Sequence, residues 1–127
     1  MPKLVITNTT PLLYLYRLGH LELLPKLYRQ IVVPQAVVKE LKAGESQGDD
    51  VPDVKNYDWI EVRSVTVPGL IGLITDLGPG EAEVLALALE QSDCLVILDD
   101  GLARSVAKLQ NLTITGTAGV LLKAKEL

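Results

Sequence analysis

Aromatic residues, histidine and cysteine are scarce in this sequence of 127 residues, which has no Phe, four Tyr, one Trp, one His and one Cys. A lone cysteine cannot form an intramolecular disulfide, which indicates a reducing compartment. Cys94 lies in an apolar run and is predicted to be a buried strand residue, and His20 is predicted to cap or pack a helix start. Neither residue supports thiol-based or histidine-based catalysis.

Long hydrophobic runs are also missing. The most apolar stretch, residues 84–98, is interrupted by polar residues, whereas a membrane helix needs roughly 18 apolar residues in succession. The first residues, MPKLVITNTTPLL, lack the charged, hydrophobic and small-residue regions of a secretory signal. We therefore predict a cytoplasmic protein with no membrane span.

Positive charge is in deficit, because 12 Lys and Arg stand against 16 Asp and Glu and give a formal net charge of −4 at pH 7. A protein that holds nucleic acid by bulk positive charge needs clustered Lys and Arg to neutralise phosphates. The composition disfavours that class of protein. It leaves open an enzyme that acts on nucleic acid with the help of metal ions.

Aliphatic residues are abundant, and the 48% hydrophobic content together with the length predicts one domain with a sizeable core. Apolar patterning and turn residues predict strands at 4–7, 31–33, 59–62, 94–98 and 112–115. Helices are predicted at 11–19, 20–28, 35–43, 81–91, 102–109 and 116–125. Because strands alternate with helices, we expect a parallel α/β sheet with helices on both faces.

Three parts of the chain carry breaker residues. Gly44 is expected to end the third helix, and the polar segment 45–57 is predicted to be a surface loop. Segment 65–74 is apolar but contains a proline and two glycines, so its pattern fits either a strand or a short helix.

Candidate chemical groups fall at the ends of predicted strands, where parallel sheets bind ligands. The polar side chains at these positions or on the following helices are Asn8, Glu40, Glu81, Asp99 and Asp100. Hard divalent cations take carboxylate oxygens, and Mg²⁺ uses one or two carboxylates while keeping several waters. Four acids in this arrangement predict a site for one or two ions.

Each of these residues also has a purely structural interpretation. Asn8 fits an N-cap, Glu81 and Glu83 fit first-turn partners of a helix dipole, and the two consecutive aspartates fit a turn and helix cap. Glu40 fits a solvated helix face. Arg104 and Lys108 share one helix face near the expected pocket, where they either contact RNA phosphates or form a solvated basic stripe.

Five segments of the sequence, in order, carry a family resemblance. They are ITNTTPLLYLYRLGHLELL, VPQAVVKEL, GPGEAEVLALALE, CLVILDDGLAR and TITGTAGVLLKAKE. Together they resemble the PIN-domain family of metal-dependent ribonucleases. More narrowly, the sequence is similar to small prokaryotic PIN proteins that resemble the toxin halves of toxin–antitoxin pairs.

The resemblance implies a single three-layer α/β/α domain over residues 1–127, with a mostly parallel sheet of about five strands. It implies an acidic pocket that binds Mg²⁺ or Mn²⁺ for phosphodiester hydrolysis of RNA. It also implies RNA as substrate, an antitoxin protein as a partner and a homodimer as the assembly. The C-terminal extension that is usual in this branch is expected to be absent.

Carried over by position, the family's acids fall on Asn8, with the neighbouring hydroxyl on Thr10, and then on Glu40, Glu81, Asp99 and Asp100. The departure is Asn8, because a neutral amide oxygen ligates a hard cation more weakly than a carboxylate does. The leading hypothesis is a metal-dependent ribonuclease. The alternative is a catalytically impaired RNA-binding or protein-interaction module, and a weaker third is a phosphoryl-binding domain that would use the two aspartates.

Overall fold

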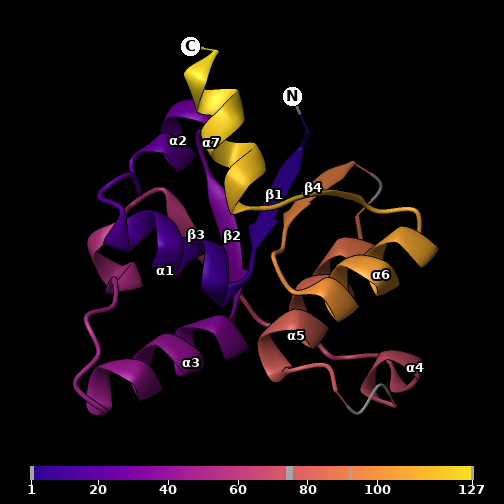
Figure 1. Cartoon of the computed structure of the whole chain (residues 1–127). Coiled ribbons are helices and arrows are strands. Elements are labelled where there is room, and N and C mark those ends of the chain that lie inside the picture. The colour runs from indigo at the N-terminus through magenta and orange to yellow at the C-terminus, as the bar shows by residue number, and fades with distance from the viewer. Residues whose placement is uncertain (1, 74–75, 92, 127) are drawn as a thin grey trace.

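A computed structural model describes residues 2–73, 76–91 and 93–126 of the chain (Figure 1). Its centre is a five-stranded sheet in the order β3-β2-β1-β4-β5, in which every pair is parallel. The strands are β1 (Leu4–Thr7), β2 (Ile31–Pro34), β3 (Ile60–Arg63), β4 (Cys94–Ile97) and β5 (Thr113–Thr115). The predicted parallel sheet of about five strands is confirmed.

Helices lie on both faces of this sheet, which confirms the predicted α/β/α layering. They are α1 (Thr9–Arg17), α2 (Leu23–Tyr28), α3 (Gln35–Ser46), α4 (Gly69–Gly72), α5 (Pro79–Leu89), α6 (Gly101–Leu109) and α7 (Thr117–Lys125), with a 3₁₀ turn η1 at Val54–Asn56. The last helix, α7, returns across the sheet to pack on α1 and α2 (Figure 1). None of the described helices combines the length and apolar character needed to cross a bilayer.

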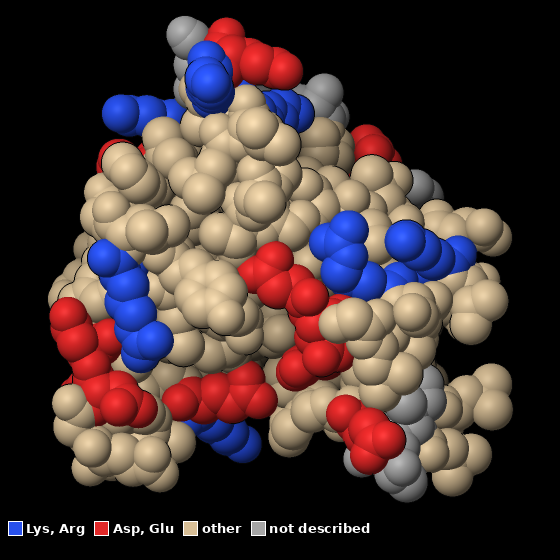
Figure 2. Space-filling model, in the orientation of Figure 1, with Lys and Arg blue, Asp and Glu red and all other residues tan. Residues whose placement is uncertain are grey.

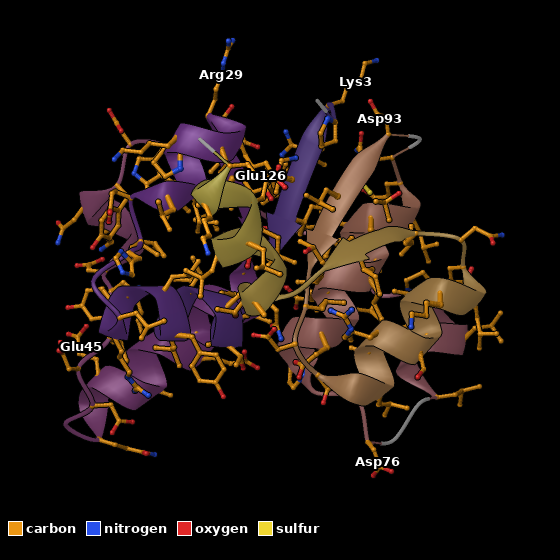
Figure 3. The ribbon with its side chains drawn as sticks, turned by 45° about the horizontal axis from the view of Figure 1, so that its top comes forward. Lys3, Arg29, Glu45, Asp76, Asp93 and Glu126 are labelled. Carbon is orange, nitrogen blue, oxygen red and sulfur yellow. The ribbon has the colours of Figure 1, made fainter. Side chains whose placement is uncertain are left out.

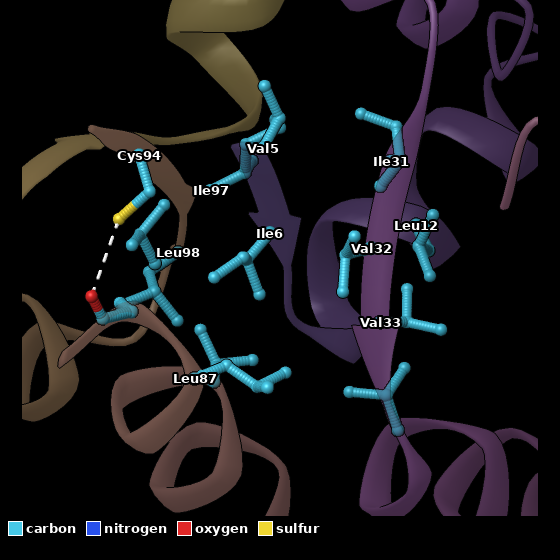
Figure 4. Packing of buried hydrophobic residues seen from close by; sticks show 14 of the residues in the cluster. Val5, Ile6, Leu12, Ile31, Val32, Val33, Leu87, Cys94, Ile97 and Leu98 are labelled. Carbon is cyan, nitrogen blue, oxygen red and sulfur yellow. Dashed lines mark hydrogen bonds between the residues drawn. The ribbon is translucent and has the colours of Figure 1, made fainter. Parts of the chain in front are cut away.

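The core is formed by the central strands and the helices that cover them (Figure 4). Ile6, Ile31 and Ile97 are fully buried, and each such side chain contributes roughly 1.5–3 kcal/mol of hydrophobic stabilisation. Helix α5 is buried on nearly all sides because it contacts β1, β2, β4, α3 and α6. Its apolar residues therefore follow no single stripe.

The strand register places the residues that follow β1 and β4 side by side. Thr7 pairs with Ile97, the Asn8 amide donates to the Ile97 carbonyl at 3.2 Å, and the Leu98 amide donates to the Thr115 carbonyl at 2.8 Å. The carboxyl ends of β1, β4 and β5 therefore meet at one edge of the sheet. The residues that follow these strands, such as Asn8 after β1 and Asp99 after β4, are therefore close together in space.

Several element boundaries differ from the sequence prediction. Helix α1 begins at Thr9, so Pro11 is its third residue and not its first, and α2 begins at Leu23 and not at residue 20. Helix α3 continues through Gly44 to Ser46, because the glycine with the left-handed backbone that ends a helix is Gly48, at φ +89°.

The other differences are in segments without regular patterning. Leu98 is buried but lies beyond β4. The predicted loop 45–57 contains the turn η1. In segment 65–74, only the four residues of α4 are regular, and the end of the segment at Ile74 is outside the described residues.

Candidate functional site

Asn8 occupies the N-cap position of α1 but does not cap it. Its backbone is extended, with φ −86° and ψ 176°, and its side chain makes no capping hydrogen bond. The residue is 2% exposed, and its Oδ1 has no hydrogen-bond partner among the described residues. Since a buried acceptor without a partner costs roughly 1–3 kcal/mol, the oxygen points to a ligand and not to a structural role.

Glu40 connects three helices at the carboxyl edge of the sheet. It lies in the second turn of α3, where its Oε1 accepts a hydrogen bond from the hydroxyl of Thr9. Its Oε2 accepts from the backbone amide of Gly80, in the first turn of α5, at 3.2 Å. Glu40 is therefore held at the site by α1 and α5 and is not a solvated helix residue.

Gly80 provides the space in which two oxygens converge. A Cβ atom at this position would lie 2.5 Å from Glu40 Oε1 and 2.8 Å from Asn8 Oδ1. Real Cβ atoms are not found so close to other atoms, so any side chain here would displace one of these groups. The absence of a side chain leaves a small cradle in which an amide oxygen and a carboxylate oxygen lie beside the amino end of α5.

Glu81 is the next residue of α5, and it interacts electrostatically with Glu40 and by a hydrogen bond with Asn8. Burial raises the pKa of its carboxyl above the ordinary value, and the negative charges of Glu40 and Asp100 raise it further. Hydrogen bonds from its own backbone and from the Asn8 side chain lower it in part. Each of these acids therefore raises the free energy of ionising Glu81, which a divalent cation would relieve.

Glu83, two residues farther along α5, has a structural role. Its Oε1 accepts a hydrogen bond from the Ala36 amide at 3.0 Å, and this amide is one of the unpaired donors at the start of α3. It thus satisfies a helix end and does not face the cradle at Gly80.

The two consecutive aspartates cap two different helices. Asp100 is the N-cap of α6, and its Oδ2 accepts from the Ala103 amide at 2.8 Å. Asp99 anchors α7 instead: its Oδ1 accepts from the Thr117 amide at 2.8 Å, and its Oδ2 accepts from the Thr117 hydroxyl. Each carboxylate oxygen of Asp99 therefore accepts one hydrogen bond, as each oxygen of Glu40 does, and the negative charge of Asp100 raises the pKa of Glu81.

Basic groups lie next to the acids. Arg104, on α6, donates from Nη1 to the Leu98 carbonyl at 2.9 Å, while Lys108 is exposed near the end of the same helix. Figure 2 shows acidic side chains grouped near the middle of this face, with basic side chains beside them on the side where α6 lies. Thr10 is half-buried on α1, but it is Thr9 whose hydroxyl contacts Glu40.

A divalent cation fits these groups in a specific way. Among residues 2–73, 76–91 and 93–126, no three His, Cys, Asp or Glu side chains lie close enough to form a metal centre by themselves. Mg²⁺, however, needs only one or two carboxylates when waters and a neutral oxygen complete its shell. Asn8 Oδ1 and Glu40 supply that minimum at Gly80, with Glu81 and Asp100 contributing negative charge.

Sequence reasoning assigned no role to three residues of this region, namely Gly80, Gly116 and Thr117, and it assigned the hydroxyl beside Asn8 to Thr10 and not to Thr9. Gly80 gave no clear signal, because it stands in the run Gly78-Pro79-Gly80 just before the predicted helix 81–91, where a glycine is ordinary. A Cβ at Gly116 would lie 2.7 Å from Asp99 Oδ1 and 3.1 Å from Arg104 Nη1. Two glycines thus allow both groups of acids to approach the backbone.

The opposite edge of the sheet has charges of its own. Figure 3 shows Lys3 and Asp93 together where β1 and β4 begin, far from Asp76 on the other side of the molecule. The Lys3 amide donates to Asp93 Oδ2 at 3.2 Å. This hydrogen bond joins the amino ends of β1 and β4 and has no part in the candidate site.

Comparison with known proteins identifies the family of the chain. Residues 4–127 match the family DUF3368, which is described as a PIN domain, and no curated protein matches the chain. The PIN domain is a nuclease fold, and its members generally depend on divalent metal ions. The matched residues include every strand and every helix described above, so the chain belongs to the PIN-domain family.

Proposed function

We propose that this protein is a Mg²⁺- or Mn²⁺-dependent ribonuclease. The observation that carries the proposal is that Asn8 Oδ1, which has no hydrogen-bond partner among the described residues, lies beside Glu40 Oε1 at Gly80, in a domain of nuclease fold. The residues proposed to position the metal are Asn8, Glu40, Glu81, Asp99 and Asp100, with Thr10 in support. Of these, Asp99 would also hold α7 in place, because both of its oxygens accept hydrogen bonds from Thr117.

A bound divalent cation would lower the pKa of a coordinated water and offset negative charge on the phosphate. The chain's own contribution is to hold the oxygens in position before substrate arrives. Thr9 and the Gly80 amide fix the Glu40 carboxylate, and burial fixes the Asn8 amide. No side chain needs to act as a nucleophile.

Arg104 and Lys108 are proposed to contact the phosphates of RNA. Arg104 lies beside Asp99 at Gly116, and Lys108 is one helical turn farther along α6. The two side chains could therefore contact successive phosphates of an RNA strand that runs from the acidic residues along α6. The four proposed acids equal the whole excess of acidic over basic residues in the chain. On this proposal, the site repels RNA until a cation is bound, and then attracts it.

The biological role that the sequence resemblance favours is the toxin component of a toxin–antitoxin pair in the cytoplasm. We propose that the chain works as a homodimer and is held inactive by an antitoxin protein. Co-expression with the product of an adjacent gene, followed by co-purification and relief of growth inhibition, tests the pairing. Light scattering of the isolated chain tests the dimer.

Glu81→Gln tests the proposed activity, with Glu83→Gln as a matched control in the same helix. We expect Glu81→Gln to abolish Mn²⁺-dependent cleavage of RNA, because it removes a charge from the site. Glu83→Gln should leave cleavage intact, since glutamine can still accept the hydrogen bond from the Ala36 amide. Equal cleavage by wild type and Glu81→Gln would contradict the assignment.

Asn8 motivates the second candidate function, an impaired PIN domain that binds RNA or a protein without cutting RNA. Asn8→Asp would add a charge beside Glu40 and Glu81, and so should strengthen binding of Mn²⁺ while destabilising the metal-free fold. A large gain in cleavage shows that the natural asparagine impairs the site. Vigorous cleavage by the wild type that Asn8→Asp does not increase removes the second candidate.

A further inference from the structure

Three of the five aromatic residues of this chain line one groove near the end of α1, whereas the candidate metal site lies at the start of that helix. The groove has a volume of about 300 Å³ and is lined by Tyr16, Gly19, Leu21, Glu22, Tyr57 and Trp59. Tyr16 lies near the end of α1, seven residues after the helix begins at Thr9, and Trp59 directly precedes β3. We call this feature the aromatic groove.

The walls of the aromatic groove are held in place by contacts within the chain. The Tyr57 and Trp59 rings lie with their centroids 5.4 Å apart and their planes tilted by 56°, so they form two sides of an angle. The Tyr16 hydroxyl donates to Asp50 Oδ1 at 3.0 Å, which fixes the third ring. Leu21 is only 6% exposed and belongs to the core. The groove is thus preformed.

Charge selects what this groove can bind. Glu22 is the only charged residue among the six that line it, and no lysine or arginine is among them. The Glu22 side chain is 54% exposed, with His20 Nδ1 at 4.0 Å, so its carboxylate is accessible from outside. Such a groove disfavours phosphate groups and favours a cation, which the faces of tyrosine and tryptophan rings also attract.

We propose that the aromatic groove binds an arginine side chain presented by a basic peptide segment of a partner protein. A guanidinium group is planar and weakly hydrated, so it can stack on a ring while its N–H groups donate to a carboxylate. Tyr57 and Trp59 supply the rings and Glu22 supplies the carboxylate. A net charge of −4 on this chain adds long-range attraction for a basic segment.

Trp59 is the only tryptophan of the chain, so its fluorescence reports on this groove alone. The experiment titrates the metal-free protein with a Gly-Arg-Gly amide peptide and with the matched peptide in which neutral citrulline replaces arginine. We expect a saturable change with the arginine peptide and at least about tenfold weaker binding of the citrulline peptide. Isothermal titration calorimetry gives a second measurement that does not depend on fluorescence.

Two variants test the role of the carboxylate. Glu22→Gln should weaken binding of the arginine peptide about three- to tenfold, and its exposed position leaves folding unaffected. Glu45→Gln is the control, because Glu45 is an exposed residue of α3 outside the groove, and it should bind as wild type does. Circular dichroism confirms that both variants are folded.

Three results would each overturn the proposal: no saturable binding by either method, equal binding of the citrulline peptide, or undiminished binding by Glu22→Gln. A uridine oligonucleotide is titrated in parallel. If it changes Trp59 fluorescence and displaces the arginine peptide, the groove is a base-stacking surface and the proposal is wrong. Because the protein is free of metal throughout, these outcomes do not depend on whether it is a nuclease.

Discussion

The two halves of the candidate site use the same kinds of side chain for different purposes. On one side, Asp99 and Asp100 place their oxygens on the amides that begin α7 and α6, so these acids hold helices. On the other side, Asn8 stands at the start of α1 without capping it, and its Oδ1 has no hydrogen-bond partner among the described residues. All three follow a strand of the same parallel sheet.

The two halves differ in whether their acceptor atoms have hydrogen-bond donors, although the residues occupy similar positions after strands. An acceptor at a helix start lowers the free energy of the fold when it caps, and raises it when it is buried without a donor. Asp99 belongs to the first kind and Asn8 to the second. A ligand is therefore expected at Asn8 and Glu40, and the aspartates are expected to support that half through charge and packing.

Replacing Asp99 should have the largest effect on stability. Asp99→Ala removes both acceptors of Thr117, whose buried amide would then be unpaired, so we expect the free energy of unfolding to fall by about 2–4 kcal/mol. Asn8→Ala removes an acceptor that has no partner among the described residues, so it should change the free energy of unfolding of the metal-free protein by only about 1 kcal/mol or less. Chemical denaturation of the metal-free proteins measures both. Similar losses in the two variants would erase the difference between the halves.

Filling the cradle should affect metal binding more than folding. Gly80→Ala places a methyl group where Glu40 and Asn8 converge, and should weaken Mn²⁺ binding by about 10- to 100-fold. Gly101→Ala is the control, because a Cβ on this residue of α6 meets nothing within 4 Å. The shift of the melting temperature with Mn²⁺ concentration reports the affinity. If both variants bind Mn²⁺ as wild type does, the cradle is not the metal site.

Binding of Mn²⁺ should have its smallest effect on Cys94 at the amino end of β4, since this end of the strand is remote from both halves of the candidate site. Burial raises the pKa of the Cys94 thiol, and the charge of Asp93 raises it further. The thiol therefore stays protonated at neutral pH, and its thiolate fraction grows only as the pH rises above the ordinary range for cysteine. We expect iodoacetamide to react at least about tenfold more slowly than with the denatured chain, with no change when Mn²⁺ is added. Acceleration by Mn²⁺ would indicate that metal binding reaches the far edge of the sheet.

Much of the fold could be predicted from local patterns. The apolar runs of β2 and β4 and the alternation of strands with helices identify a parallel sheet, because a strand covered on both faces has few polar residues. Boundaries were less predictable. Gly44 resembles a helix stop in sequence, yet the glycine with a left-handed backbone is Gly48, and α3 continues to Ser46.

The candidate site was predictable in its members and not in their roles. Strand ends indicated Asn8, Glu40 and the aspartates, since such positions converge in parallel sheets. The spacing could not show that Glu40 reaches the Gly80 amide, that Thr9 and not Thr10 contacts it, or that Asp99 turns toward Thr117. These contacts join residues separated by 18 to 40 positions in the chain.

The amino-acid sequence by itself determined the class of fold, the family and the shortage of positive charge, because these depend on composition and on patterns within single elements. Only the tertiary structure decided which polar groups are satisfied. A hydrogen bond consumes an acceptor only when a donor from another element arrives beside it, and the packing of α1, α3, α5 and α7 around the sheet decides that. The same acidic residues that looked alike in the sequence are thereby divided into helix caps and a candidate metal site.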